Sequence, residues 1–329
     1  MDVELTGHLQ GRKYEQWKAF LSKAGLSPDG QMERTVLIWD EAELIATGSR
    51  NGNLLKCIAV EDSRQGEGLT ATLLTQLRQD AFSSGHSHLF LYTKPKNRLQ
   101  FSSLFFYPIA ETQQVLLMEN KQNGMAHFLD SLPVADNQGI VGAAVMNCNP
   151  FTNGHRYLIE TAAAQCDRLY IFVLSEDKSE FSAADRMEMV RLGTQDLPNV
   201  TVLPTGPYLI SSATFPTYFL KDRDAASEVQ CLLDIEIFCK YFAPRFSITR
   251  RYVGTEPLSP MTNQYNDALR LHLPDRGIEF REITRLEQSD APVSASAVRA
   301  YLKKGDISAL RALIPETTYE YLKSHDYLK

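Results

Sequence analysis

The stretch of residues 141–166 constrains the fold more than any other, because a strand, a tight turn and a helix follow one another within it. Residues 141–146 form a short apolar run that is typical of a buried parallel strand. A polar turn containing Pro150 comes next, and residues 155–166 then have the apolar spacing of a helix. A strand that leads into a helix N-terminus is a common phosphate site, because unpaired backbone N–H groups and the helix dipole point at the anion.

The turn contains a Thr-Asn-Gly-His motif at residues 152–155. Gly154 permits a close approach of the backbone to a ligand, Thr152 offers a hydroxyl group, and His155 offers an imidazole in the first helical turn. Four-residue motifs also recur by chance, so a capped turn with a surface histidine is the competing interpretation. A second phosphate motif elsewhere in the chain is needed to decide between the two.

Composition excludes several classes of protein. The 329 residues are 43% hydrophobic and 22% charged, which indicates a globular chain long enough for two domains. The net charge of −6 argues against a general nucleic-acid binder, although a local basic groove stays open. The chain starts without an apolar signal segment, and no apolar run approaches membrane-spanning length, so we expect a cytoplasmic protein with no membrane partner. The five cysteines are scattered without a CxxC pair, which favours reduced thiols over disulfides or a zinc site.

The first part of the chain is predicted to be an α+β domain. Its expected elements are a helix over residues 14–24, strands at 35–39, 43–47 and 54–60, a helix to about residue 83, a strand at 88–93, a short helix at 97–105 and a strand at 112–118. The turn Arg64-x-Gly66-x-Gly68 opens the second helix, and with this element order it resembles the GNAT acetyltransferases. In that superfamily such a turn wraps the pyrophosphate of coenzyme A. Thr70 stands where the family pattern has Gly or Ala, so a CoA-like site and a turn without a ligand both stay open.

The second part of the chain alternates strands and helices. A polar segment near residues 134–139 separates the two parts, so we expect domains over residues 1–134 and 139–329. After the first strand and helix, the expected strands are at 168–175, 200–203, 247–253 and 278–283, and the expected helices at 182–196, 222–242 and 263–273. This succession predicts a Rossmann-like, doubly wound parallel sheet with ligands at the carboxyl ends of its strands.

The partner motif is Val-Ser-Ala-Ser-Ala-Val-Arg at residues 293–299, which opens a helix after the last strand. Ser294 is placed to cap that helix, Ser296 to meet phosphate oxygens, and Arg299 to bind an anion with its planar fork. Alone it would be a capped helix with a surface arginine. It resembles the ISSTxxR signature of the HxGH/TxGH nucleotidyltransferase superfamily. Because it follows the motif at residues 152–155 in the right order, the two together favour nucleotidyl transfer.

Over essentially its full length the chain resembles the citrate lyase ligases, through the runs NPFTNGHRYLIE, FVLSEDKSEFSAADR and YVGTEPLSPMTNQYN and the two-domain combination. The resemblance implies an AMP-forming ligase that uses ATP with Mg²⁺ to activate acetate as acetyl-adenylate. It also implies acetyl transfer to the thiol of the phosphoribosyl-dephospho-CoA group on the acyl-carrier subunit of citrate lyase. Catalytic roles are implied for Thr152, His155 and Arg299. Cofactor contacts are expected from Asn149, Phe151, Gly154, Lys178, Gly254, Glu256, Ser294, Ser296, Arg64, Gly66 and Gly68, and no metal site built from protein ligands is expected.

Four residues near these motifs each have two interpretations. Cys148 is a nucleophile or, since no obvious base partners it, more simply a small filler of the turn. Lys178 neutralises phosphate or is a solvated loop lysine. Arg186 neutralises phosphate or forms a surface salt bridge on its helix. Glu256 binds a ribose or only caps a turn.

Two rival functions stay open at this point. One is an adenylyltransferase of cofactor biosynthesis, of the pantetheine-phosphate or nicotinamide-nucleotide type. It shares the nucleotidyl chemistry but does not explain a CoA-like domain. The other is a GNAT acetyltransferase that uses acetyl-CoA, which leaves both phosphate motifs of the second domain idle.

Overall fold

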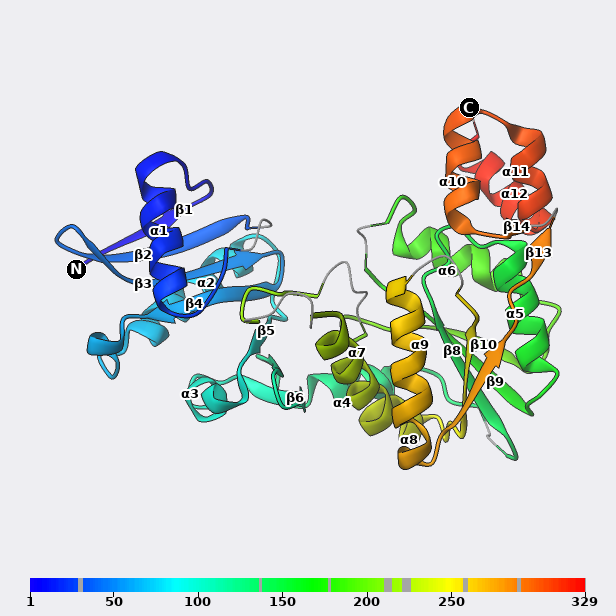
Figure 1. Ribbon diagram of the computed structural model, residues 1–329, viewed down its shortest axis with the longest axis horizontal. Coiled ribbons are helices and arrows are strands. Elements are labelled where there is room, and N and C mark those ends of the chain that lie inside the picture. Colours follow the sequence, from blue (N-terminus) through cyan, green and yellow to red (C-terminus); the bar gives the residue numbers. More distant parts are fainter. Residues whose placement is uncertain are drawn as a thin grey trace. The chain divides into compact units, whose positions relative to one another are not determined.

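The computed structural model of the protein describes residues 1–28, 32–135, 138–176, 179–209, 215–220, 226–256, 260–288 and 291–328 (Figure 1). The chain forms two compact units, one of Met1–Met125 and Phe215–Glu236 and the other of Ala126–Thr214 and Ile237–Lys329. The domain ranges expected from the sequence, 1–134 and 139–329, remain predictions. In the described part of the chain, no helix combines the length and apolar character that crossing a membrane requires.

Unit 1 is built on a seven-stranded sheet with the order β1-β2-β3-β4-β5-β7-β6. Its strands are β1 (Asp2–Thr6), β2 (Arg34–Asp40), β3 (Glu43–Asn51), β4 (Leu54–Val60), β5 (Phe90–Thr93), β6 (Tyr107–Glu111) and β7 (Leu116–Glu119). Neighbouring strands are antiparallel except for the parallel pair β4 and β5. The predicted α+β architecture of this part of the chain is confirmed. Strand β1 is not predicted from the sequence, because all of its side chains stay at least partly exposed and no apolar run marks it.

One helix of unit 1, α2 (Leu69–Ser83), covers this sheet with apolar side chains. The other helices of the unit are α1 (Gly11–Lys23) and α3 (Arg98–Ser102), and α7 (Ala226–Ile237) begins in its later segment. Leu73 and Leu77 of α2 are fully buried in one cluster with Val36 and Ile38 of β2. Their spacing of four residues places both leucines on the same face of the helix, which is the face that meets the sheet.

Strands β4 and β5 pair only through Leu54 and Leu55 at the start of β4. Residues farther along both strands line a cavity of about 600 Å³ within unit 1. Part of its wall comes from the segment of residues 215–220. Tyr218 in this segment donates its hydroxyl to the backbone carbonyl of Tyr92 at 2.5 Å, and its own carbonyl accepts from the backbone N–H of Ser27 at 2.8 Å. These bonds fix a distant stretch of sequence to the edge of the cavity.

Unit 2 contains a five-stranded sheet with the order β10-β9-β8-β11-β12. Its strands are β8 (Val141–Met146), β9 (Arg168–Val173), β10 (Val200–Pro204), β11 (Arg250–Gly254) and β12 (Glu279–Ile283). All neighbouring strands are parallel, which confirms the predicted doubly wound sheet. The strand order reverses between β8 and β11, and the carboxyl ends of strands at such a switch point are where ligands bind in this class of fold.

The remaining α-helices lie wholly or mostly in unit 2. They are α4 (Gly124–Ser131), α5 (Asn153–Ala163), α6 (Ala183–Leu192), α8 (Ala243–Arg245), α9 (Pro260–His272), α10 (Ala295–Lys304), α11 (Ile307–Leu313) and α12 (Glu316–Ser324). A two-stranded ribbon, β13 (Glu287–Gln288) and β14 (Ala291–Pro292), precedes α10. The long helix expected over residues 222–242 is α7 followed by a π-helical turn at Phe238–Phe242, while residues 222–225 lie outside the described part. Helices α4, α11 and α12 are not predicted from the sequence.

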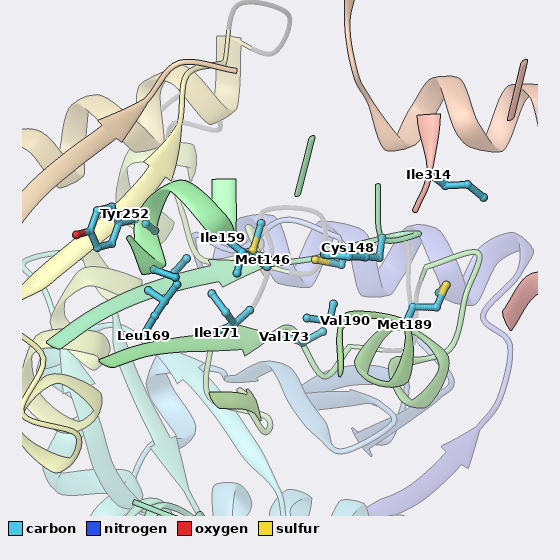
Figure 2. Packing of buried hydrophobic residues seen from close by; sticks show 14 of the residues in the cluster. Met146, Cys148, Ile159, Leu169, Ile171, Val173, Met189, Val190, Tyr252 and Ile314 are labelled. Carbon is cyan, nitrogen blue, oxygen red and sulfur yellow. The ribbon is translucent and has the colours of Figure 1, made fainter. Parts of the chain in front are cut away.

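The parallel sheet of unit 2 is buried in the core of the unit. Nearly every residue of β9 is buried, which is typical of a strand that is covered on both faces. Figure 2 shows side chains from two strands and two helices meeting in one cluster: Met146, Ile159, Ile171, Val173 and Val190. This packing fixes the start of α5 relative to the end of β8, which is the turn that carries the first phosphate motif.

Candidate active site

Helix α5 begins with a reciprocal pair of bonds between Thr152 and His155. Thr152 is the N-cap residue, and its Oγ1 accepts the backbone N–H of His155 at 3.3 Å. In return, the backbone N–H of Thr152 donates to Nδ1 of His155 at 3.1 Å. This is a capping box in which histidine takes the place usually held by Glu or Gln. The first helical turn thereby fixes the orientation of the imidazole.

The same bond determines where the imidazole carries its proton. A nitrogen that accepts an N–H bond must present its lone pair, so neutral His155 carries hydrogen on Nε2. Burial of the ring, and secondly the positive charge of Arg285, lower the pKa of His155 to about 4. At neutral pH His155 is therefore an uncharged donor with a known donating atom.

Phe151 supports the ring of His155 from the core side. Its side chain is fully buried, and the two rings are stacked with centroids 6.0 Å apart and an angle of 15° between their planes. A Cβ on Gly193 would lie 2.3 Å from Cε1 of Phe151, so this packing requires glycine at position 193. With its side chain enclosed, Phe151 has only its backbone to offer to a nucleotide.

Helix α10 presents the second motif, and Arg299 ties it to the first. Ser294 is the N-cap residue, and its Oγ accepts the backbone N–H of Ala297 at 3.1 Å. Arg299 donates from Nη2 to Oγ of Ser296 at 3.0 Å and from Nη1 to the backbone carbonyl of Asn149. The side chain of Asn149 points elsewhere, because its Oδ1 accepts the backbone N–H of Phe181 at 3.1 Å. The two motifs recognised in the sequence are thus joined in space.

Gly154 brings the two motifs into contact at a second point. A Cβ at this position would lie 3.1 Å from the carbonyl oxygen of Val293, the residue before the N-cap of α10. Such a distance is shorter than ordinary van der Waals contact, so any side chain at position 154 would press on Val293. Glycine at position 154 therefore allows the two helix N-termini to approach one another closely.

The end of β11 contributes Gly254 and Glu256. A Cβ on Gly254 would lie 3.1 Å from Cδ1 of Leu158, so this glycine makes room for α5. Both carboxylate oxygens of Glu256 accept from Nη1 of Arg285 at 2.6 Å. Arg285 belongs to no motif, and the sequence contains no spacing rule that identifies it. Its pairing with Glu256, together with the effect of its charge on the pKa of His155, makes it the site residue that sequence reasoning missed.

Of the three other candidates, Cys148 and Arg186 have clear positions and Lys178 does not belong to the described part of the chain. Cys148 is buried, and burial raises the pKa of its thiol to about 12, which leaves it protonated and favours the filler interpretation. Arg186 is fully buried, so the prediction of a surface salt bridge is wrong. It donates to the backbone carbonyls of Asn147, Glu176 and Phe181, and the bond to Asn147 ties it to the turn that carries the first motif.

Among the residues that the structure describes, no group of three or more His, Cys, Asp or Glu side chains is arranged to hold a metal ion.

The glycine-rich turn of unit 1 borders the 600 Å³ cavity. Gly66 and Gly68 both have positive φ values, 92° and 78°, and no atom lies within 4 Å of a Cβ built on either. Gly68 is the N-cap residue of α2 and provides no side-chain cap. Arg64 also lines the cavity, and it donates to Asp40 and to Glu67 at 2.8 Å each. Open backbone N–H groups at the start of α2 are thus available on the cavity side.

The chain is similar to known proteins over most of its length. A sequence profile described as "Citrate lyase ligase C-terminal domain" matches residues 141–322. A ligase of citrate (pro-3S)-lyase from Escherichia coli strain K12 is 40% identical over 322 residues, which cover 96% of this chain and 92% of that protein. The corresponding ligase of Klebsiella pneumoniae is 41% identical over 309 residues, 92% of this chain and 90% of its own length. Among solved structures, an acyl-CoA N-acyltransferase from Pseudomonas aeruginosa has a TM-score of 0.32 and 13% identity over 36% of this chain and 99% of its own, too weak a likeness to carry an argument.

Proposed function

The chain belongs to the citrate lyase ligase family, and from this premise we propose that it is an ATP-dependent, AMP-forming acid–thiol ligase that acts on citrate lyase. In the first half-reaction, acetate and ATP give acetyl-adenylate and pyrophosphate. In the second, the thiol of a phosphoribosyl-dephospho-CoA group on the acyl-carrier subunit of citrate lyase takes the acetyl group, and AMP leaves. The ligase activity named for both relatives supports this target.

The observation that carries the proposal is the junction of the two phosphate motifs at the switch point of the unit 2 sheet. His155 presents a neutral Nε2–H at the N-terminus of α5, and Arg299 links the N-terminus of α10 to the same turn. The junction suits a polyphosphate, because it supplies N–H groups to oxygen anions. These come from two helix N-termini, one neutral donor and one guanidinium. A site for binding an uncharged substrate would have no need for this set of donors.

The residues of the junction divide between the phosphates. We assign Thr152 and His155 to the α-phosphate, and Ser296, Arg299 and the N-terminus of α10 to the β- and γ-phosphates. Ser294 acts indirectly, since its Oγ is engaged in capping α10. Gly254 and Glu256, at the end of β11, are assigned to the nucleoside, with Glu256 held in place by Arg285. Mg²⁺ bound to the nucleotide would neutralise part of the phosphate charge.

Adenylation follows from this arrangement without a covalent intermediate on the enzyme. A carboxylate oxygen of acetate attacks the α-phosphorus in line, and the bond to the oxygen that bridges to the β-phosphorus breaks. Negative charge shifts onto the pyrophosphate as this bond breaks, and the N-terminus of α10 faces it. The Nε2–H of His155 donates to a non-bridging oxygen of the α-phosphate during the transition state. The buried, protonated thiol of Cys148 has no part in this step.

The second half-reaction needs a place for the prosthetic arm, and we assign it to the cavity of unit 1. The arm contains phosphates of its own, and Gly66 and Gly68 leave backbone N–H groups open at the start of α2. Lys94 and Lys96 also line the cavity and add positive charge. The thiol sulfur attacks the carbonyl carbon of acetyl-adenylate, and the bond from that carbon to the phosphate oxygen of AMP breaks.

The test of the function is exchange of labelled pyrophosphate into ATP, measured with and without acetate. Acetate-dependent exchange is the expected result, because reversible adenylation alone produces it. Exchange that requires a phosphorylated nucleophile instead of acetate would establish the adenylyltransferase alternative. Acetyl transfer from acetyl-CoA in the absence of ATP would establish the GNAT acetyltransferase alternative.

A further inference from the structure

The guanidinium group of Arg251 is buried in unit 2 with donors that have no acceptor. Arg251 lies on β11 and is only 2% exposed. Within the part of the chain that the structure describes, neither its Nε nor its Nη1 has a hydrogen-bond partner. An arginine side chain keeps its charge in proteins, and burying a charge without a partner is strongly unfavourable. The unpaired donors therefore point to an acceptor that comes from outside the chain.

Arg251 projects from one of the two strands that form the switch point of the sheet. In register it stands beside Ala143 of β8, which in turn stands beside Tyr170 of β9. Side chains alternate between the two faces of a strand, so Arg251 points to the face opposite to that of Tyr252. Tyr252 belongs to the same cluster as Ile159 of α5 (Figure 2), so Arg251 lies on the face away from α5. The carboxyl end of its strand is the part assigned above to the nucleoside.

The neighbours of Arg251 on this face are mainly apolar. The Cζ atom of Arg251 lies 4.6 Å from the centroid of the Phe238 ring, which belongs to the π-helical turn before α8. A ring against the guanidinium offsets part of its charge but leaves the N–H groups along its edge without an acceptor. Ala143 contributes a methyl group, and the hydroxyl of Tyr170 accepts the backbone N–H of Ala135 at 3.1 Å. A π-helical turn beside such a group is also frequent at functional sites.

The acidic side chain on the same face of β12 is engaged elsewhere. Phe280 is the register partner of Arg251 on β12, and Glu282 follows it by two positions, so all three face the same side. The carboxylate of Glu282 accepts from Arg270 at 2.8 Å and from Asn266 at 3.3 Å. Its charge is thus compensated by residues of α9 and not by Arg251.

The chemistry of these groups selects a class of ligand. A carboxylate is planar and accepts two N–H groups of a guanidinium at once. One guanidinium suits a single negative charge, and the ring of Phe238 and the methyl group of Ala143 suit a short apolar substituent. A polyphosphate would need further donors, such as those at the junction of the two phosphate motifs.

We propose that Arg251 binds the carboxylate of a small monocarboxylic acid, on the face of the unit 2 sheet away from α5. Two sources share this chemistry. One is the acetate that is adenylated, and this assignment rests on the proposed function. The other is a carboxylate that stays bound as the counter-ion of Arg251 and takes no part in the reaction.

The first measurement is thermal unfolding of the full chain in increasing sodium acetate, at constant ionic strength and without nucleotide. Acetate should raise the Tm of the wild type, since a ligand that binds the folded state stabilises it by mass action. Acetamide, which has the same shape without the charge, should not. In Arg251→Met the rise should disappear. Without any carboxylate this variant should unfold at the wild-type temperature or above, because it removes an unpaired buried charge.

Arg250→Met is the matched control, since Arg250 precedes Arg251 on β11 and donates to Glu279 at 2.6 Å. It removes the same charge one position away, and the rise in Tm with acetate should stay. A wild-type Tm that does not respond to acetate would overturn the proposal, as would an equal rise in folded Arg251→Met. If Arg251→Met does not fold, Arg251→Lys is used, which lacks the planar fork and should need about tenfold more acetate for the same rise. An acetate dependence of Arg251→Lys equal to that of the wild type would then overturn the proposal.

The second measurement distinguishes the two sources by the KM values of pyrophosphate exchange. If the bound acid is the substrate, Arg251→Met should raise the KM for acetate by about tenfold or more and leave the KM for ATP within about threefold. If the acid is a counter-ion, both KM values should stay while the response of the Tm to acetate is lost. Wild-type exchange that is absent, together with an acetate response of the Tm that Arg251→Met abolishes, would disprove the proposed function and leave the carboxylate site standing.

Discussion

The guanidinium of Arg299 donates a hydrogen bond to the backbone carbonyl of Asn149, across 150 positions of the sequence. The same side chain also donates to Oγ of Ser296 on its own helix. One residue therefore binds the turn after β8 to the first turn of α10, and a planar fork with several donors is what allows both bonds at once. The relative placement of the two phosphate motifs depends on this side chain.

Arg299→Lys keeps the charge but removes the fork, so a lysine cannot hold Asn149 and Ser296 together. We expect the KM for ATP in pyrophosphate exchange to rise by about tenfold or more, which corresponds to losing one hydrogen bond of a charged group. The KM for acetate should change less. Lys303→Ala is the control, because Lys303 contacts the same Glu180 carboxylate at 3.3 Å without reaching the turn. An unchanged KM for ATP in Arg299→Lys would show that the planar fork of Arg299 does not contribute to ATP binding.

His155→Ala and His155→Asn separate the donor from the cap. Both remove the Nε2–H, and we expect kcat of adenylation to fall by roughly 10² to 10⁴-fold, as for loss of a preorganised transition-state donor. The oxygen of the Asn side chain can still accept from the N–H of Thr152, so this variant should unfold at nearly the wild-type temperature. The measurements are exchange kinetics and thermal unfolding. A kcat within threefold of wild type in either variant would show that His155 takes no part in adenylation.

Local patterns in the sequence reveal a large part of this site, for a physical reason. The strand, turn and helix at residues 141–166 follow from apolar periodicity and turn chemistry, which act between near neighbours. Ser294 caps its helix as predicted, because capping depends on a single short polar side chain in the right place. These features can be recognised without knowing what else packs nearby.

Residues that reach the site through contacts between distant parts of the chain cannot be recognised from local sequence patterns. Arg285 acquires its position only through Glu256 and Val293, and neither stands at a fixed spacing from it. Arg186 has the composition of a surface residue, yet it is buried because loop carbonyls gather around it in the fold. The placement of Phe215–Glu236 in unit 1 is likewise a tertiary property that its own sequence does not express.

Gly154→Ala tests the contact between the two helix N-termini. The added methyl group would lie 3.1 Å from the carbonyl oxygen of Val293, so the two segments must separate by a few tenths of an ångström. We expect kcat of exchange to fall by about tenfold or more, because small displacements of aligned groups are costly in catalysis. Asn153→Ala changes the same turn without approaching Val293, since Asn153 donates to the carbonyl of Ala312, and its rate should stay within about threefold of wild type. Equal rates in Gly154→Ala and wild type would mean that the approach is not needed for adenylation.

The last prediction separates the two half-reactions between the two units. Gly66→Leu with Gly68→Leu places bulky side chains where backbone N–H groups now face the cavity, so phosphates of the prosthetic arm should be kept away. Acetate-dependent pyrophosphate exchange should persist, while acetyl transfer to the carrier thiol should fall by at least about tenfold, a loss of about 1.4 kcal/mol. Gly85→Leu is the matched control, because Gly85 has a φ of 85° and equally open surroundings but does not line the cavity. The backbone strain that leucine introduces at position 85 is comparable, so the acetyl transfer rate of Gly85→Leu should match that of the wild type. A folded double variant that transfers acetyl at the wild-type rate would show that the cavity of unit 1 does not receive the arm.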